Sequence, residues 1–179
     1  MKISLYKRFY LVNILFFLIA SISIIVSNVS YDAEYEMAMG YRLLKGDTPI
    51  LEMWEPNQTS AFLCAIVMKL YMSIAGTTTG IVLFVNMVGY LIRVAIAGFL
   101  YYRVNKMSGK VPALIACFLF ILIGPKDMLV PDYSNMEVWF STLTVLFLVE
   151  FLENKKVWQL VLSAVCMCFG VISYPSYII

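Results

Sequence analysis

The chain has 179 residues, of which 62% are hydrophobic and 13% are charged, and its formal net charge is +2. A soluble domain carries about 25% charged residues, so this composition excludes an ordinary soluble protein. The small net charge, without a basic cluster, excludes a nucleic-acid-binding protein. The apolar residues gather in runs of membrane-spanning length, which predicts an all-α, polytopic bundle of transmembrane helices.

The first apolar run covers residues 9–29 and follows three basic residues, Lys2, Lys7 and Arg8. It is longer than the hydrophobic region of a cleavable signal peptide, which has about 7–15 residues, and it ends without a convincing cleavage site. We therefore expect a retained first span of a multi-pass cell-membrane protein, with the N-terminus in the cytoplasm.

A polar segment, residues 30–60, follows this run and carries six acidic but only two basic side chains. A loop without an excess of lysine and arginine is expected outside the cell. Within it, Asp32 is expected to cap an amphipathic helix over residues 33–45, which Gly46 ends. The apolar residues of that helix recur every three or four positions: Ala33, Met37, Tyr41 and Leu44. Such a helix would lie on the outer membrane surface.

Five more apolar segments follow: residues 61–75, 81–102, 112–124, 138–152 and 157–179. If all of them crossed the membrane, the loop with Arg103, Lys106 and Lys110 would lie outside, against the positive-inside rule. Residues 61–75 are short for a span and have Lys69 near their middle. We therefore predict one membrane domain with five spans, in which residues 61–75 form an interfacial or re-entrant helix.

This topology places three acids, Asp32, Glu34 and Glu137, on the same external side. Asp32 and Glu137 each stand within a few residues of a span, where scarce water raises the pKa of a carboxyl group. They are the candidate catalytic residues, and the alternative for each is an ordinary solvated charge.

Two cations, Lys69 and Arg93, lie within apolar runs, where a charge is costly and indicates function by default. The guanidinium of Arg93 suits a phosphate, and the alternative is that it pairs with a buried polar group. Lys69 would either extend to the lipid headgroups or contact a lipid phosphate.

Three stretches resemble the GT-C superfamily of membrane glycosyltransferases, in particular bacterial members related to protein O-mannosyltransferases and aminoarabinose transferases. The first is "YDAEYEMAMGYRLLKGDTPI" with "EPNQTSAFLCAIVMKLYMSIAG", which is similar to the first external loop of that family. The matching features are Asp32, Tyr35, Ala38, Gly46-Asp47, Pro56 and Gly76. The others are "YSNMEVWFSTLTVLFLVEFLEN", which places Glu137 at an external acid before a span, and "CMCFGVISYPSYII".

The resemblance implies transfer of a sugar from a polyprenyl-phosphate donor to an unidentified acceptor at the outer face of the membrane. Asp32 would be the catalytic base or a metal-associated acid, and Glu137 its partner from a second loop. Glu34 and Tyr35 would help to bind substrate, and Lys69 or Arg93 would stabilise the departing phosphate. The resemblance does not identify a cofactor, although a divalent cation is compatible with this chemistry.

Two features depart from the family pattern. Many relatives have Lys-Pro before the hydrophobic helix that follows the loop, whereas this chain has Glu55-Pro56. Relatives also continue beyond the position of "SYPSYII", so we expect the N-terminal portion of a longer fold or one part of a split enzyme. The alternatives are a non-enzymatic multi-pass protein, such as a transporter subunit or assembly partner, and an inactive remnant.

Overall fold

A computed structural model of the chain describes residues 5–27, 30–53, 57–125 and 129–174, with side chains in the first helix from Val12 onward. These residues confirm the predicted all-helical class, since they form seven α-helices and no β-strand. The helices are α1 (Leu5–Ser27), α2 (Tyr31–Lys45), α3 (Ala61–Ala75), α4 (Ile81–Ser108), α5 (Lys110–Leu122), α6 (Tyr133–Asn154) and α7 (Val157–Ser173).

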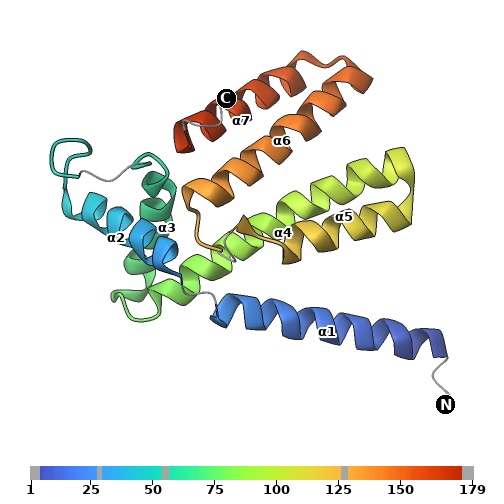
Figure 1. Ribbon diagram of the computed structural model, residues 1–179, viewed down its shortest axis with the longest axis horizontal. Coiled ribbons are helices and arrows are strands. Elements are labelled where there is room, and N and C mark those ends of the chain that lie inside the picture. Colours follow the sequence, from blue (N-terminus) through green and yellow to red (C-terminus); the bar gives the residue numbers. More distant parts are fainter. Residues whose placement is uncertain (1–4, 28–29, 54–56, 126–128, 175–179) are drawn as a thin grey trace.

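Two antiparallel helical hairpins form the body of the structure, one from α4 and α5 and the other from α6 and α7 (Figure 1). Gly109 turns the chain in the first hairpin, and Lys155 and Lys156 turn it in the second. Helix α1 lies along α4, while α2 and α3 sit at the end of the bundle away from both hairpin turns (Figure 1). We call this the α2–α3 end.

Two helices, α4 and α6, are long and apolar enough to cross a membrane by themselves. A third candidate is α1 with α2, which qualify together only as a pair bent by 62°. Helices α3, α5 and α7 are apolar but shorter. The described residues thus contain two to three candidate spans, fewer than the five that the sequence predicted, because α5 and α7 are shorter than a bilayer requires of a lone helix.

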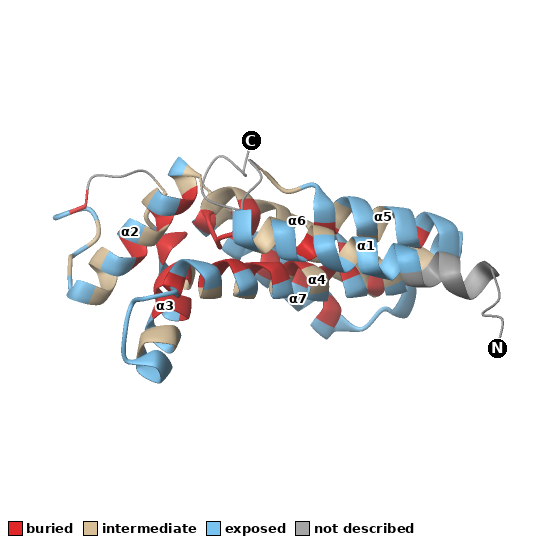
Figure 2. Ribbon diagram, turned by 90° about the horizontal axis from the view of Figure 1, so that it is seen from below, coloured by how far each residue is buried: buried red, intermediate tan, exposed pale blue. Residues whose placement is uncertain are grey.

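Many of the exposed residues of α1, α5 and α7 are large and apolar. Figure 2 shows that exposed positions make up much of these helices, while buried positions are concentrated where the helices meet. Val12, Phe16 and Ile22 of α1 are examples, with 65%, 71% and 61% of their surface exposed. A soluble protein rarely presents such continuous apolar surface, whereas a helix against lipid does. The exposed apolar surface of these helices is therefore typical of a membrane protein.

Ser30, and not the predicted Asp32, caps α2. The side chain of Ser30 accepts a hydrogen bond from the backbone N–H of Ala33, and its own backbone is extended. Asp32 consequently lies in the first helical turn, where its charge complements the positive end of the helix dipole. The predicted end at Gly46 is confirmed, because this glycine has the left-handed φ of 101°.

The buried face of α2 is also rotated from the predicted one. It consists of Ala33, Glu36, Met39 and Gly40, whereas the predicted Tyr41 is exposed. The reason is a close approach between α2 and α3. A Cβ atom on Gly40 would lie 3.2 Å from the backbone nitrogen of Ala65, so the two helices meet at this glycine.

Two of the long helices extend beyond their predicted limits. Helix α4 continues to Ser108, because Arg103 and Lys106 in its last turns find acidic partners on α6. Helix α6 begins at Tyr133 and not at residue 138, since Asp132 caps it. Glu137 therefore lies in the second turn of α6 and does not open the helix.

The end with the hairpin turns is held by ion pairs. Arg103, which is 1% exposed, lies 2.7 Å from Glu150 and 2.9 Å from Glu153 of α6. Glu150 also accepts a 3.1 Å hydrogen bond from Gln159 of α7, so this cluster joins three helices. Basic residues gather at this end of the bundle, and the acids of α2 lie at the opposite one (Figure 1).

Candidate functional site

Five buried polar side chains gather at the α2–α3 end, where α2, α3, α4 and the start of α6 meet. We call them the polar junction: Glu36, Ser60, Arg93, Asp132 and Asn135. None is more than 3% exposed. Buried polar groups cost free energy unless they are paired, so a cluster of this kind indicates either a structural network or a functional site.

Asp132 reaches the polar junction at the end of a short segment, residues 129–132. All four are buried, and they run directly into α6. Gly89 of α4 makes room for them, because a Cβ atom at this position would lie 1.7 Å from the carbonyl oxygen of Leu129. Asp132 then caps α6 by accepting hydrogen bonds from the backbone N–H groups of Asn135 (2.9 Å) and Ser134 (3.3 Å).

Arg93 connects α4 with α6 inside the junction. Its Nη2 donates a 2.6 Å hydrogen bond to Oδ1 of Asn135, and its Nη1 donates a 3.4 Å bond to the carbonyl of Ile121. Gly124 lies against the guanidinium, where a Cβ atom would come within 2.5 Å of Nη2. These contacts therefore match the alternative role for Arg93, in which it pairs with a buried polar group. Phosphate binding by Arg93 stays a prediction.

Two further hydrogen bonds tie α1 to α4 beside the junction. The hydroxyl of Tyr90 donates a hydrogen bond to Oγ of Ser21, and Nδ2 of Asn86 donates a 3.2 Å bond to the carbonyl of Ile25. Tyr90 lies one turn before Arg93 on α4. Polar side chains thus extend from α1 through α4 to the start of α6.

Glu36 is the most unusual member of the junction. It belongs to α2, which has five charged residues among fifteen and is therefore too polar to lie within the hydrocarbon of a membrane. Burial raises the pKa of the Glu36 carboxyl from 4.5 to about 8, a polar contact with Ser60 opposes the rise, and the charge of Asp132 adds to it. The carboxyl group is consequently protonated at neutral pH.

The predicted catalytic acids lie near the junction but outside it. Asp32 is partly buried in the first turn of α2, one turn before Glu36 on the same face. Glu137 is partly buried in the second turn of α6, five residues after Asp132. Both helices start at the α2–α3 end, so the two acids share one end of the bundle (Figure 1).

The predicted substrate-binding residues of α2 face different surroundings. Glu34 is exposed and lines an open cavity of about 350 Å³ with Met37, Tyr41 and Met68. Tyr35 is partly buried and packs against Met39, Met53 and Ala61. Only Arg93, of the six predicted site residues, belongs to the polar junction.

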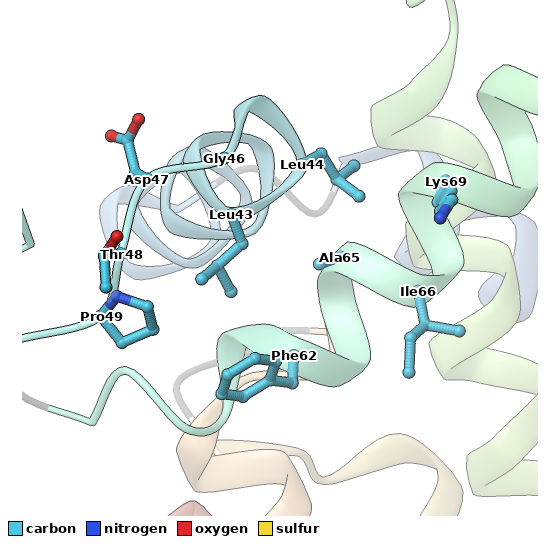
Figure 3. A pocket seen from close by; sticks show the side chains of 10 residues that line it. All are labelled: Leu43, Leu44, Gly46, Asp47, Thr48, Pro49, Phe62, Ala65, Ile66 and Lys69. Atoms are coloured by element: carbon cyan, nitrogen blue, oxygen red, sulfur yellow. The ribbon is translucent and has the colours of Figure 1, made fainter.

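Lys69 lies on the exposed side of α3, in a groove between that helix and the C-terminal end of α2 (Figure 3). The groove has a volume of about 490 Å³ and is lined mainly by apolar side chains: Leu43, Leu44, Pro49, Phe62, Ala65 and Ile66. Asp47, at the far end of the groove from Lys69 in Figure 3, pairs with Arg42 at 2.7 Å. An apolar groove with one cation is suited to an anionic group that carries a hydrocarbon chain.

Sequence reasoning missed four members of the junction, namely Glu36, Ser60, Asp132 and Asn135. A signal for Glu36 was present, since it follows Ala33 by three residues and precedes Gly40 by four, which places it on one helical face with them. Asp132 stands three residues before Asn135 after a proline, a spacing typical of a helix N-terminus. The matched Pro56 and the departure at Glu55 lie outside the described residues.

Within the described part of the chain, no three histidine, cysteine, aspartate or glutamate side chains gather closely enough to hold a metal ion. No protein-family model, curated protein or solved structure matches the chain. The geometry of the α2–α3 end is therefore the basis for a functional proposal.

Proposed function

We propose that the chain is a membrane glycosyltransferase of the GT-C type, or a module of one, that uses a polyprenyl-phosphate sugar as donor. The observation that carries the proposal is the α2–α3 end. It combines two acids from separate helices, Asp32 and Glu137, with a groove that holds the exposed cation Lys69. A reaction between a lipid-linked donor and a polar acceptor is assisted by a general base and by a cation that stabilises the departing phosphate.

The proposed chemistry assigns a role to each residue. Asp32 accepts the proton of an acceptor hydroxyl while the hydroxyl oxygen attacks the anomeric carbon of the sugar. The bond from that carbon to the lipid phosphate breaks, and the phosphate leaves with the electron pair. Lys69, on the edge of an apolar groove, is better exposed than Arg93 to stabilise the departing charge. Glu137, with Glu34 and Tyr35, would orient the acceptor and the sugar.

The proposal includes the membrane topology. The α2–α3 end lies outside and the two hairpin turns lie in the cytoplasm, together with the N-terminus. Helices α5 and α7 return beside α4 and α6 and complete five spans, with their short ends shielded by the neighbouring helix. The basic residues of the hairpin turns, Arg103, Lys106, Lys110, Lys155 and Lys156, are then all cytoplasmic.

Transfer from a radiolabelled polyprenyl-phosphate sugar tests the function in membranes that contain the full chain. We expect Asp32→Asn to lower the rate by about 100-fold or more, as the loss of a general base does. Glu137→Gln should also lower transfer, whereas Glu153→Gln, at the other end of the bundle, should not. Equal transfer by all four proteins would remove both acids from the reaction, and transfer by none would favour a non-enzymatic role.

A further inference from the structure

The carboxyl group of Glu36 is enclosed by three parts of the fold. It projects from the buried face of α2 toward Ser60 at the start of α3 and toward Asp132 before α6. Glu36 is 0% exposed, and neither oxygen of its carboxyl group accepts a well-aligned hydrogen bond from the described residues. A buried carboxylate without such bonds would be strongly disfavoured.

Ser60 compensates a negative charge at this position only in part, because burial has the larger effect on the pKa of Glu36. Its single hydroxyl proton is donated to the carbonyl oxygen of Asn57, 2.6 Å away. While that bond is kept, Oγ can accept a hydrogen bond from a protonated Glu36, and it can donate one to the carboxylate only by giving up Asn57. A protonated Glu36 can therefore donate to Ser60 without breaking the hydrogen bond between Ser60 and Asn57.

The charged groups around Glu36 act in both directions, since the acids favour its neutral form and the cation Arg93 favours its charged form. Segment 129–132 contributes Asp132, whose charge acts directly on Glu36, and α3 contributes the buried thiol of Cys64. Helix α4 contributes Arg93, whose guanidinium is bound to Asn135. On α2 itself, Asp32 lies one turn before Glu36. A second carboxylate next to a buried one favours the neutral form of the latter.

We propose that Glu36 is a proton-binding site that controls the docking of α2. With the proton bound, α2 packs against α3 through Gly40 and against segment 129–132. When the proton is lost, α2 separates from α3, because the charged carboxylate regains water only by leaving the interface. This inference concerns the fold at the α2–α3 end and does not depend on the transfer reaction.

The direction of the pH dependence follows from linkage. In the docked state the pKa of Glu36 is raised to about 8, and in the undocked state it returns to near 4.5. Docking is therefore fully favoured below pH 4.5, weakens as the pH rises through the interval between the two values, and weakens no further above pH 8. Acid closes the α2–α3 contact and alkali opens it.

Cys64 offers a built-in reporter for this opening. It is 0% exposed, and it packs with Ala33 in the core beneath α2. A variant of the full chain that keeps Cys64 alone, with Cys117, Cys166 and Cys168 changed to alanine, would be labelled with a maleimide in mild detergent at pH 6, 7 and 8. An exposed cysteine serves as the reference, namely Glu52→Cys in a chain that lacks Cys64. Each labelling rate of Cys64 is divided by the rate of this reference at the same pH, and the division removes the pH dependence of the thiol reaction itself.

We expect the normalised rate of Cys64 to rise with pH between 6 and 8, by up to about tenfold per pH unit, the limit for one linked proton. In Glu36→Gln the rate should not depend on pH. A flat rate in the parent chain, or equal slopes in the two chains, would overturn the proposal.

Hydrogen–deuterium exchange of the unmodified chain gives a second measurement if Glu36→Gln does not fold. After correction for the intrinsic pH dependence of amide exchange, the amides of α2 should lose protection between pH 6 and 8, while those of α6 keep it. Constant protection of α2 over that range would contradict proton-controlled docking.

Discussion

Nη2 of Arg93 in α4 donates a 2.6 Å hydrogen bond to Oδ1 of Asn135 in α6, and the two side chains are almost completely buried. Asn135 in turn donates a 2.9 Å bond from Nδ2 to the carbonyl of Val130. The two helical hairpins are therefore joined at the α2–α3 end by a polar chain that runs through the backbone of segment 129–132. Arg103 and Glu150 join them at the other end.

Replacement of Arg93 by leucine should destabilise the protein. The change removes the buried hydrogen bond to Oδ1 of Asn135, and removing one partner of a buried hydrogen bond costs about 1–3 kcal/mol. Thermal unfolding in detergent would measure the loss. Lys69→Leu is the matched control, since this cation is exposed and its loss should change stability by no more than about 0.5 kcal/mol. Equal melting temperatures for the two variants would show that the contact between Arg93 and Asn135 does not contribute to stability.

Two glycines of α4 should respond in opposite ways to the same substitution. Gly89→Ala places a Cβ atom 1.7 Å from the carbonyl oxygen of Leu129, so the backbone of segment 129–132 must move. At Gly98 no atom lies within 4 Å of the new Cβ, and alanine is the better helix former by up to about 1 kcal/mol. We expect a lower melting temperature for Gly89→Ala and an equal or higher one for Gly98→Ala. A tolerated Gly89→Ala would mean that segment 129–132 does not approach α4.

The helices themselves follow from local patterns in the sequence. Residues 61–75 were predicted as a helix with the bounds that α3 has, because polar residues and Gly76 delimit a short apolar run. The all-helical class follows in the same way from the apolar runs. The cap of α2 was placed two residues too late, since Ser30 and Asp32 are both good cap residues and only the backbone conformation distinguishes them.

The polar junction could not be derived from the sequence, because its members come from parts of the chain that only tertiary packing brings together. Glu36 and Asp132 are almost one hundred positions apart, and the local pattern around each one does not show that the two lie side by side. What decides their environment is the approach of segment 129–132 to α4, which depends on a missing side chain at Gly89. The catalytic roles of Asp32 and Glu137 stay predictions.

The two acids that face Arg103 should differ in their importance for stability. Glu150 is 11% exposed in its side chain and also accepts hydrogen bonds from α7 and Asn154, whereas the side chain of Glu153 is 34% exposed. Removing one partner of a buried pair costs about 3–5 kcal/mol, whereas removing an exposed partner costs much less. Glu150→Ala should therefore lower the melting temperature far more than Glu153→Ala. Equal effects would contradict the burial of the pair.

The topology predicts opposite accessibility for two exposed positions. Cysteine at Glu52, between α2 and α3, should react in intact cells with a maleimide that cannot cross the membrane. Cysteine at Ser108, the last residue of α4, should react only after the cells are opened. The four native cysteines would first be changed to alanine. Reaction of both positions from outside would rule out the five-span arrangement.

Stability should depend on pH through Glu36. Burial raises the pKa of this group to about 8 in the folded protein, and in the unfolded chain it returns to about 4.5. Between these values the unfolded chain binds fewer protons than the folded one, so the free energy of unfolding should fall by roughly 1.4 kcal/mol per pH unit from this group alone. Glu36→Gln has no proton to lose and should lack this component, so its stability relative to the parent should rise from pH 5 to pH 8. Chemical unfolding of both proteins in detergent at pH 5, 6, 7 and 8 provides the comparison, and a constant difference between them would mean that Glu36 is already charged in the folded state.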